Sequence, residues 1–142
     1  MQPKTIINCN RKRYKMSTIH SFEELECWKA AREIKIFVSE QVLKKLPKDE
    51  QYDLTSQLRR SSRSISDNIA EGFGRFHFQE NIQYCRVGRG SLHESLNQVI
   101  TALDESYIDA IILTEFRVLF LKTNSLLNGY INYLTKMKSN NK

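Results

Sequence analysis

Long apolar runs are missing from this sequence, because no stretch approaches the ~20 residues that a membrane-spanning helix needs. The N-terminus also lacks the apolar segment of a secretory signal peptide. No alternation of apolar and polar residues marks a strand. What remains is 142 residues, 40% of them hydrophobic, enough for one domain that buries ~68–70% of its unfolded surface. We therefore expect a single domain that does not enter a membrane.

Cysteine is scarce as well. The three cysteines, Cys9, Cys27 and Cys85, are odd in number and form no C-x-x-C pair. Disulfides belong to oxidising compartments, whereas free thiols persist in a reducing one. We predict free thiols and a cytoplasmic location.

Signatures of catalysis are lacking too. Gly72 and Gly74 lie close together but without the strand, turn and helix of a dinucleotide-binding motif, and no G-x-x-x-x-G-K-[ST] loop occurs. Di-iron helical bundles need Glu-x-x-His pairs. The residues three positions before the histidines are Ser17, Gly74 and Gly90. We predict no enzymatic activity, no metal site and no cofactor.

Acidic residues are absent from the first 20 positions, which hold five bases. The whole chain carries a net charge of +6, and without these positions 17 bases face 16 acids, a net of +1. Residues 1–18 therefore form a basic leader with two open interpretations. Either it is a disordered arm that contacts nucleic acid, or translation begins at Met16 and the leader is not part of the protein.

Residues 54–75 (LTSQLRRSSRSISDNIAEGFGR) are the most informative part of the chain. Apolar residues recur there at steps of three, four and seven, which return to one face of a helix. They are Leu54, Leu58, Ile65, Ile69 and Phe73. Pro47 and Asp49 are typical of a helix start, and Gly72 and Gly74 of a helix end. The pattern predicts one helix of about five turns.

A polar stripe lies beside this apolar face. Its members are Gln57, Ser61, Ser64, Asn68 and Glu71. Serines weaken an isolated helix because their hydroxyls compete for backbone groups, so tertiary packing has to compensate. One interpretation is a buried contact with a neighbouring helix, in which Asn68 or Glu71 pairs with Ser91. The other is a solvated stripe on an ordinary helix.

Three further helices accompany this one. An S-x-x-E capping box at Ser21 and Glu24 begins a helix that reaches about residue 46. The next runs from about residue 78 to 103, and there Gly90 and Ser91 are expected to admit a neighbouring backbone or the polar stripe. A fourth begins between Asp109 and Thr114 and continues with a heptad-like apolar pattern.

Four helices joined by short turns predict an all-α domain, an antiparallel up-down-up-down four-helix bundle. We assign the bundle to residues 19–138 and a polar tail to residues 139–142.

These residues also carry a resemblance. Residues 57–60 (QLRR) and 64–75 (SISDNIAEGFGR) look like the signature of the four-helix-bundle proteins encoded in intervening sequences of bacterial large-subunit (23S) ribosomal RNA genes. Three more segments resemble the family's first, third and closing helices. They are residues 22–30 (FEELECWKA), 90–94 (GSLHE) and 127–131 (LNGYI).

The resemblance, which covers about residues 19–136, implies a bundle that assembles as a homopentamer. A related branch, the accessory variability determinants of diversity-generating retroelements, forms basic pentamers that bind a reverse transcriptase and nucleic acid. The near-neutral body of this chain departs from that basic character. Ser61 and Ser62 stand where the family usually has a small apolar residue, which is expected to loosen the local packing.

Arginines on the second and third helices are the candidate nucleic-acid-binding residues. They are Arg59, Arg60, Arg63, Arg75, Arg86 and Arg89. Such a cluster can neutralise phosphates, and Phe76, Phe78 and Tyr84 offer surfaces for stacking. The alternative is a solvated face whose arginines pair with nearby acids. A structural polar motif is predicted from Gln57, Ser64, Asn68, Glu71, Ser91 and Glu94.

The sequence thus predicts a non-enzymatic homo-oligomer, a pentamer by resemblance, with weakly sequence-specific binding of RNA or DNA. The alternative is a structural or protein-interaction module, such as an adaptor for a reverse transcriptase, without nucleic-acid binding of its own.

Overall fold

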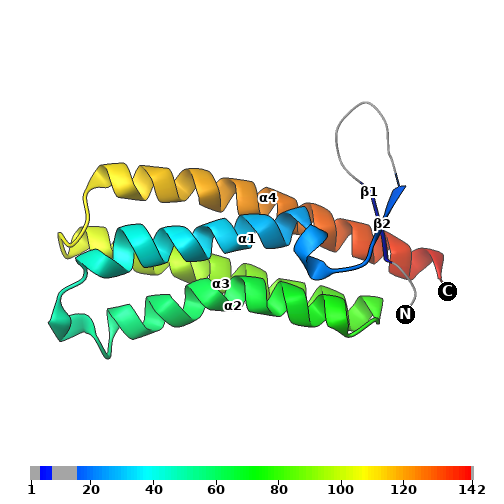
Figure 1. Ribbon diagram of the computed structural model, residues 1–142, viewed down its shortest axis with the longest axis horizontal. Coiled ribbons are helices and arrows are strands. Elements are labelled where there is room, and N and C mark those ends of the chain that lie inside the picture. Colours follow the sequence, from blue (N-terminus) through cyan, green and yellow to red (C-terminus); the bar gives the residue numbers. More distant parts are fainter. Residues whose placement is uncertain (1–3, 8–15, 142) are drawn as a thin grey trace.

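A computed structural model describes residues 4–7 and 16–141 of the chain. Its main elements are the helices α1 (Glu26–Phe37), α2 (Leu54–Gly74), α3 (Phe78–Asp104) and α4 (Ala110–Asn140). Figure 1 shows these helices side by side along one long axis, each running opposite to the one before it. The predicted all-α four-helix bundle is confirmed.

Contacts between distant residues agree with this antiparallel order. The Ser61 hydroxyl lies 2.6 Å from the side-chain oxygen of Gln98, and the Ser64 hydroxyl lies 2.8 Å from that of Ser91. Position numbers therefore rise along α2 while they fall along α3. None of the helices in the described residues is long and apolar enough to cross a membrane.

Ser21 and Glu24 both accept backbone hydrogen bonds, but they form neither the reciprocal capping box that was predicted nor the start of an α-helix. Ser21 caps a 3-10 turn, η1 (Phe22–Glu24), by accepting a hydrogen bond from the Glu23 N–H at 3.2 Å. The Glu24 carboxylate accepts from the His20 N–H at 3.0 Å. Helix α1 begins only after this turn.

Helix α1 continues into two irregular segments before it ends. They are the π-helical η2 (Val38–Val42) and the 3-10 segment η3 (Leu43–Lys45). Leu46 is then extended, with a ψ of 137°, because the Pro47 ring disfavours the helical region for the residue before it. The predicted end near residue 46 is thus confirmed, and a further 3-10 turn, η4 (Lys48–Glu50), leads toward α2.

The core lies along the shared axis and contains the predicted apolar face of α2. All five apolar residues of that face are buried. Trp28 lies at the margin, where its ring packs edge-on against Phe22 with the centroids 5.2 Å apart. The bundle therefore buries the stripe that periodicity identified.

Helix α4 begins at a cap that the sequence predicted. The Asp109 carboxylate accepts a hydrogen bond from the Ile112 N–H at 3.0 Å. At its other end α4 reaches Asn140, so the first two residues of the predicted polar tail are helical. The Ser139 hydroxyl there donates to the Thr135 carbonyl at 3.1 Å. The helix runs on because no glycine or proline interrupts it in this stretch.

Two short strands precede the bundle, although the sequence showed no strand pattern. They are β1 (Lys4–Ile7) and β2 (Met16–Ile19), paired antiparallel with Lys4 opposite Ile19. Four residues each are too few to show an alternation, but both contain the β-branched types that favour extended backbone. The basic leader residues Arg11, Lys12, Arg13 and Lys15 lie outside the described residues.

Candidate nucleic-acid interface

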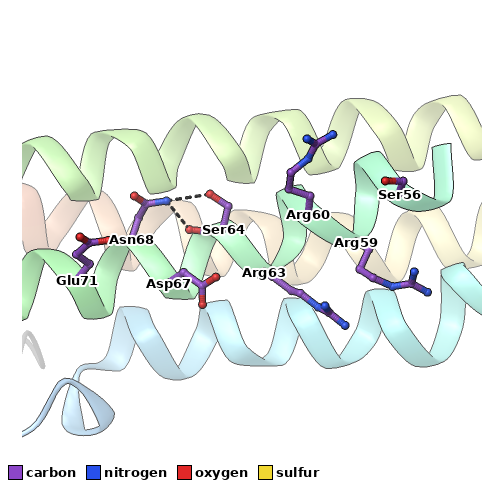
Figure 2. A pocket seen from close by; sticks show the side chains of 8 residues that line it. All are labelled: Ser56, Arg59, Arg60, Arg63, Ser64, Asp67, Asn68 and Glu71. Atoms are coloured by element: carbon purple, nitrogen blue, oxygen red, sulfur yellow. Dashed lines mark hydrogen bonds between the residues drawn. The ribbon is translucent and has the colours of Figure 1, made fainter. Parts of the chain in front are cut away.

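Helix α2 buries its apolar face and leaves the opposite face open between α1 and α3. Figure 2 looks onto that open face. Its first half carries Arg59, Arg60 and Arg63, and its second half carries Asp67 and Glu71, all of them exposed. Charge of opposite sign is therefore separated along one helix.

A surface hollow of about 550 Å³ follows this face. Its lining residues all come from α2 and are Ser56, Arg59, Arg60, Arg63, Ser64, Asp67, Asn68 and Glu71. We call it the arginine hollow. From Ser56 to Glu71 it extends for about 22 Å, because an α-helix rises 1.5 Å per residue.

A second hollow, of about 400 Å³, lies between α1 and α2. Its lining includes Lys35 and Ile36 from α1 and Leu43 from η3. It shares Arg59 and Arg63 with the arginine hollow. In Figure 2 the side chains of Arg59 and Arg63 point toward α1, while Arg60 points toward α3. The two hollows therefore meet along the row of arginines.

The guanidinium groups of Arg59, Arg60 and Arg63 have no ion pair or hydrogen bond within the described part of the chain. The ion pairs seen there join Lys29 to Glu26, Arg75 to Glu71 and Lys122 to Glu33. Asp67 lies one helical turn beyond Arg63, yet the two do not pair. Each free guanidinium keeps five N–H donors available for an anion.

Arg75 lies at the far end of α2 and is engaged. It donates to the Glu71 carboxylate at 3.0 Å and to the Tyr84 hydroxyl at 2.9 Å. Its guanidinium carbon also lies 5.3 Å from the centre of the Tyr84 ring. The hydrogen bond that Arg75 donates to Glu71, and then the charge of Tyr84, raise the pKa of Arg75. This arginine is therefore separate from the three in the hollow.

Arg86 and Arg89 lie on α3, away from the arginine hollow. Arg89 donates to the side-chain oxygen of Asn128 at 2.8 Å, so it is turned toward α4. Arg86 is three residues earlier and shares that side of the helix. The structure thus brings together three of the six predicted arginines and separates the other three from them.

None of the aromatic residues that the sequence suggested for stacking lines the arginine hollow. Tyr84 is covered by Arg75, and Phe78 packs against the core. Phe76 is 51% exposed, with a φ of 60°, in the turn between α2 and α3. Sequence reasoning missed Tyr52, which is 85% exposed in the turn before α2. A residue in a turn has no periodic pattern that would have identified it.

The polar stripe of α2 does contact α3, but through a different residue from the one predicted. The Ser64 hydroxyl lies 2.8 Å from that of Ser91, while the Asn68 amide donates to the Ser64 carbonyl at 2.7 Å and hydroxyl at 2.8 Å. Asn68 thus turns back onto its own helix, and Glu71 pairs with Arg75. The predicted pairing of Asn68 or Glu71 with Ser91 is wrong.

Of the other members of the predicted polar motif, one is exposed and one takes part in a hydrogen bond. Gln57 is exposed, whereas Glu94 accepts from the buried Gln98 amide at 3.1 Å. Ser61 and Ser62 are each only 2% exposed. The Ser61 hydroxyl is bonded to α3, and that of Ser62 to the Arg59 carbonyl at 3.2 Å. Their packing is therefore close and hydrogen-bonded rather than loose.

Two buried thiols occupy the core. Cys27 and Cys85 are both buried, and burial raises the pKa of the Cys27 thiol. Within residues 4–7 and 16–141 no group of three histidine, cysteine or acidic side chains could hold a metal ion.

The fold and this site define a class: a four-helix bundle with an open basic face on its second helix. Comparison with family models identifies the class more closely. The model of the 23S rRNA-intervening sequence protein matches residues 23–129. The chain belongs to this family, as its sequence motifs indicated. A comparison with curated proteins found no match.

Proposed function

We propose that this protein binds the phosphate backbone of RNA or DNA at the arginine hollow, with weak sequence specificity. The observation that carries the proposal is the set of three exposed guanidiniums, Arg59, Arg60 and Arg63, which are unpaired in the described part of the chain. They lie within five residues of one helix, a rise of about 6 Å. Neutralising phosphates releases counterions and supplies sequence-independent affinity.

The local charge also favours phosphate binding at the N-terminal end of α2, where the three arginines lie. Residues 44–63 hold six bases and three acids, a net of +3, whereas residues 64–80 hold one base and three acids, a net of −2. A phosphate chain would therefore lie at the arginine end of the hollow and avoid the carboxylates of Asp67 and Glu71.

A second candidate function is that of a structural or protein-interaction module. Helix α4 exposes a row of apolar side chains, with Ile111, Val118 and Leu121 exposed by 68%, 64% and 65%. Steps of seven and three place them along one side of the helix, and an exposed apolar row marks an interaction surface. It would serve the homo-oligomer, a pentamer by family resemblance, or a partner such as a reverse transcriptase.

Both functions are non-enzymatic and belong in the cytoplasm, where the buried thiols would stay reduced. They are also compatible, because the arginine hollow and the apolar row lie on different helices. The salt dependence of binding separates them.

The test is binding of a fluorescent RNA over a series of salt concentrations. We expect affinity to fall steeply with salt and Arg60→Ala to reduce the slope of log K against log[salt] by about 1. Arg86→Ala is the matched control, since this exposed arginine lies outside the hollow, and it should leave the slope unchanged. No detectable binding at low salt would contradict the proposal and leave the interaction module, which light scattering tests through the oligomeric state.

A further inference from the structure

We infer that the arginine hollow takes single-stranded rather than double-stranded nucleic acid, with Tyr52 as the platform on which a base stacks. This inference rests on the proposed phosphate binding and names the form of nucleic acid that the same site accepts.

Tyr52 has an unusual environment for an aromatic residue. Its 85% exposure is the highest among the large hydrophobic side chains of residues 19–141. A buried aromatic side chain contributes strongly to a core, so this ring adds little to stability where it lies. The ring face is instead open to a ligand, and every nucleobase offers a face to stack on it.

The turn that carries Tyr52 is held at the arginine end of α2. The Glu50 carboxylate accepts a hydrogen bond from the Leu54 N–H at 3.0 Å and from the Tyr107 hydroxyl at 3.1 Å. Ser56, which lines the hollow, follows Tyr52 by four residues, a span of at most ~14 Å. A base on Tyr52 and phosphates on Arg59 and Arg60 therefore fit one short strand.

The second hollow supplies an apolar wall on the other side of the arginines. Ile36 is 39% exposed there, and Leu43 lines the same space together with Arg59 and Arg63. A nucleotide whose phosphate lies on these guanidiniums would have its base beside either this apolar wall or Tyr52. Bases of a duplex are stacked and paired inside it, whereas those of a single strand are free to turn toward such surfaces.

The length of the hollow limits the size of the ligand. At ~22 Å along a helix that rises 1.5 Å per residue, it has room for a short strand only. Asp67 and Glu71 line the far part of the hollow, and they would repel the backbone there. A short single strand, bound at the Tyr52 end, is the best match.

Three fluorescent probes of similar length test the inference in the same binding assay. They are a single-stranded 12-nucleotide RNA, the duplex of the same sequence, and a single strand whose residues are abasic. We expect the single strand to bind about ten-fold more tightly than the abasic strand, the size of one stacking contact. Tyr52→Ala should remove that ten-fold difference, and Tyr52→Phe should retain it. Arg60→Ala should weaken all three probes.

Tyr52→Trp adds a readout that a merely structural role would not change. Stacking on the introduced ring should quench its fluorescence with the single strand and not with the abasic strand. The thermal melts of the Tyr52 variants should match the wild type, because the side chain is exposed. Equal affinity for single strand and duplex, unaltered by Tyr52→Ala, would overturn this inference and leave phosphate binding intact. Failure of every probe to bind would overturn the proposed function as well.

Discussion

The contacts of α2 with α3 and of α1 with α4 are built from different side chains. Between α2 and α3 the buried contacts come from small residues, such as Ser61 and Ser95, whose hydroxyls lie 2.9 Å apart. Between α1 and α4 large rings meet, as where the centroids of Phe37 and Phe116 lie 6.1 Å apart. One contact region depends on hydrogen bonds and close approach, and the other on apolar volume.

The difference explains why the outer face of α2 is available for a ligand. Gly88 on α3 lies so close to α2 that a Cβ there would be 3.2 Å from the Ile65 carbonyl. Small side chains let the two helices approach, and the hydroxyls satisfy each other where water is excluded. Helix α2 is thus held from its inner side, and Arg59, Arg60 and Arg63 take no part in holding it.

The largest expected effect is on the apolar side of this comparison. Phe116→Ala should lower the free energy of unfolding by about 3–5 kcal/mol, because it empties a fully buried ring site. Urea denaturation followed by circular dichroism measures it. Arg117→Ala, at the next and exposed position, should change stability by less than about 0.5 kcal/mol. A loss at Phe116 no larger than at Arg117 would contradict the role of α4 in the core.

A smaller loss is expected on the polar side. Ser61→Ala should cost about 1–3 kcal/mol, because it leaves the buried oxygen of Gln98 without its partner at 2.6 Å. The exposed Ser56→Ala on the same helix is the control and should be nearly neutral. Adding Gln98→Leu to Ser61→Ala should recover part of the loss, since removing both partners is cheaper than removing one. A double variant as unstable as the sum of the singles would argue against this hydrogen bond.

Periodicity predicted the helices well because each prediction needed only residues close in sequence. The buried face of α2 and the Asp109 cap follow from local patterns. The start signals Pro47 and Asp49 belong instead to the 3-10 turn before α2, which itself begins at Leu54. The partner of Ser91 did not, because a repeat of 3.6 residues gives the face of a helix and not its axial register against a neighbour. That register places Ser64, rather than Asn68, opposite Ser91.

The candidate site shows the same limit. Helical spacing placed Arg59 and Arg63 on one side of α2, and the structure keeps them together. Spacing could not tell which helix faces Arg89, whose partner Asn128 is 39 residues away. Tyr52 carried no signal, because its position depends on how the turn before α2 is held.

The smallest expected effects come from two glycines, and they differ in sign. At Gly72 a Cβ would lie 2.8 Å from both the Asn81 side-chain oxygen and the Tyr84 Cβ, whereas at Gly90 nothing lies within 4 Å. Gly72→Ala should therefore destabilise by about 1 kcal/mol, the overpacking cost being partly offset by the better helix propensity of alanine.

Gly90→Ala should instead stabilise by about 0.5–1 kcal/mol, because only the propensity gain applies. The urea midpoints of the two variants are measured side by side. Both replace glycine by alanine, so the difference between them reports whether the added methyl group meets a neighbouring helix or open space. The sequence had placed the close approach at Gly90 and Ser91. Stabilisation by both substitutions would mean that α3 can move away from Gly72. The hydrogen bond that Asn81 donates to Tyr130 at 3.0 Å would then have to move with it.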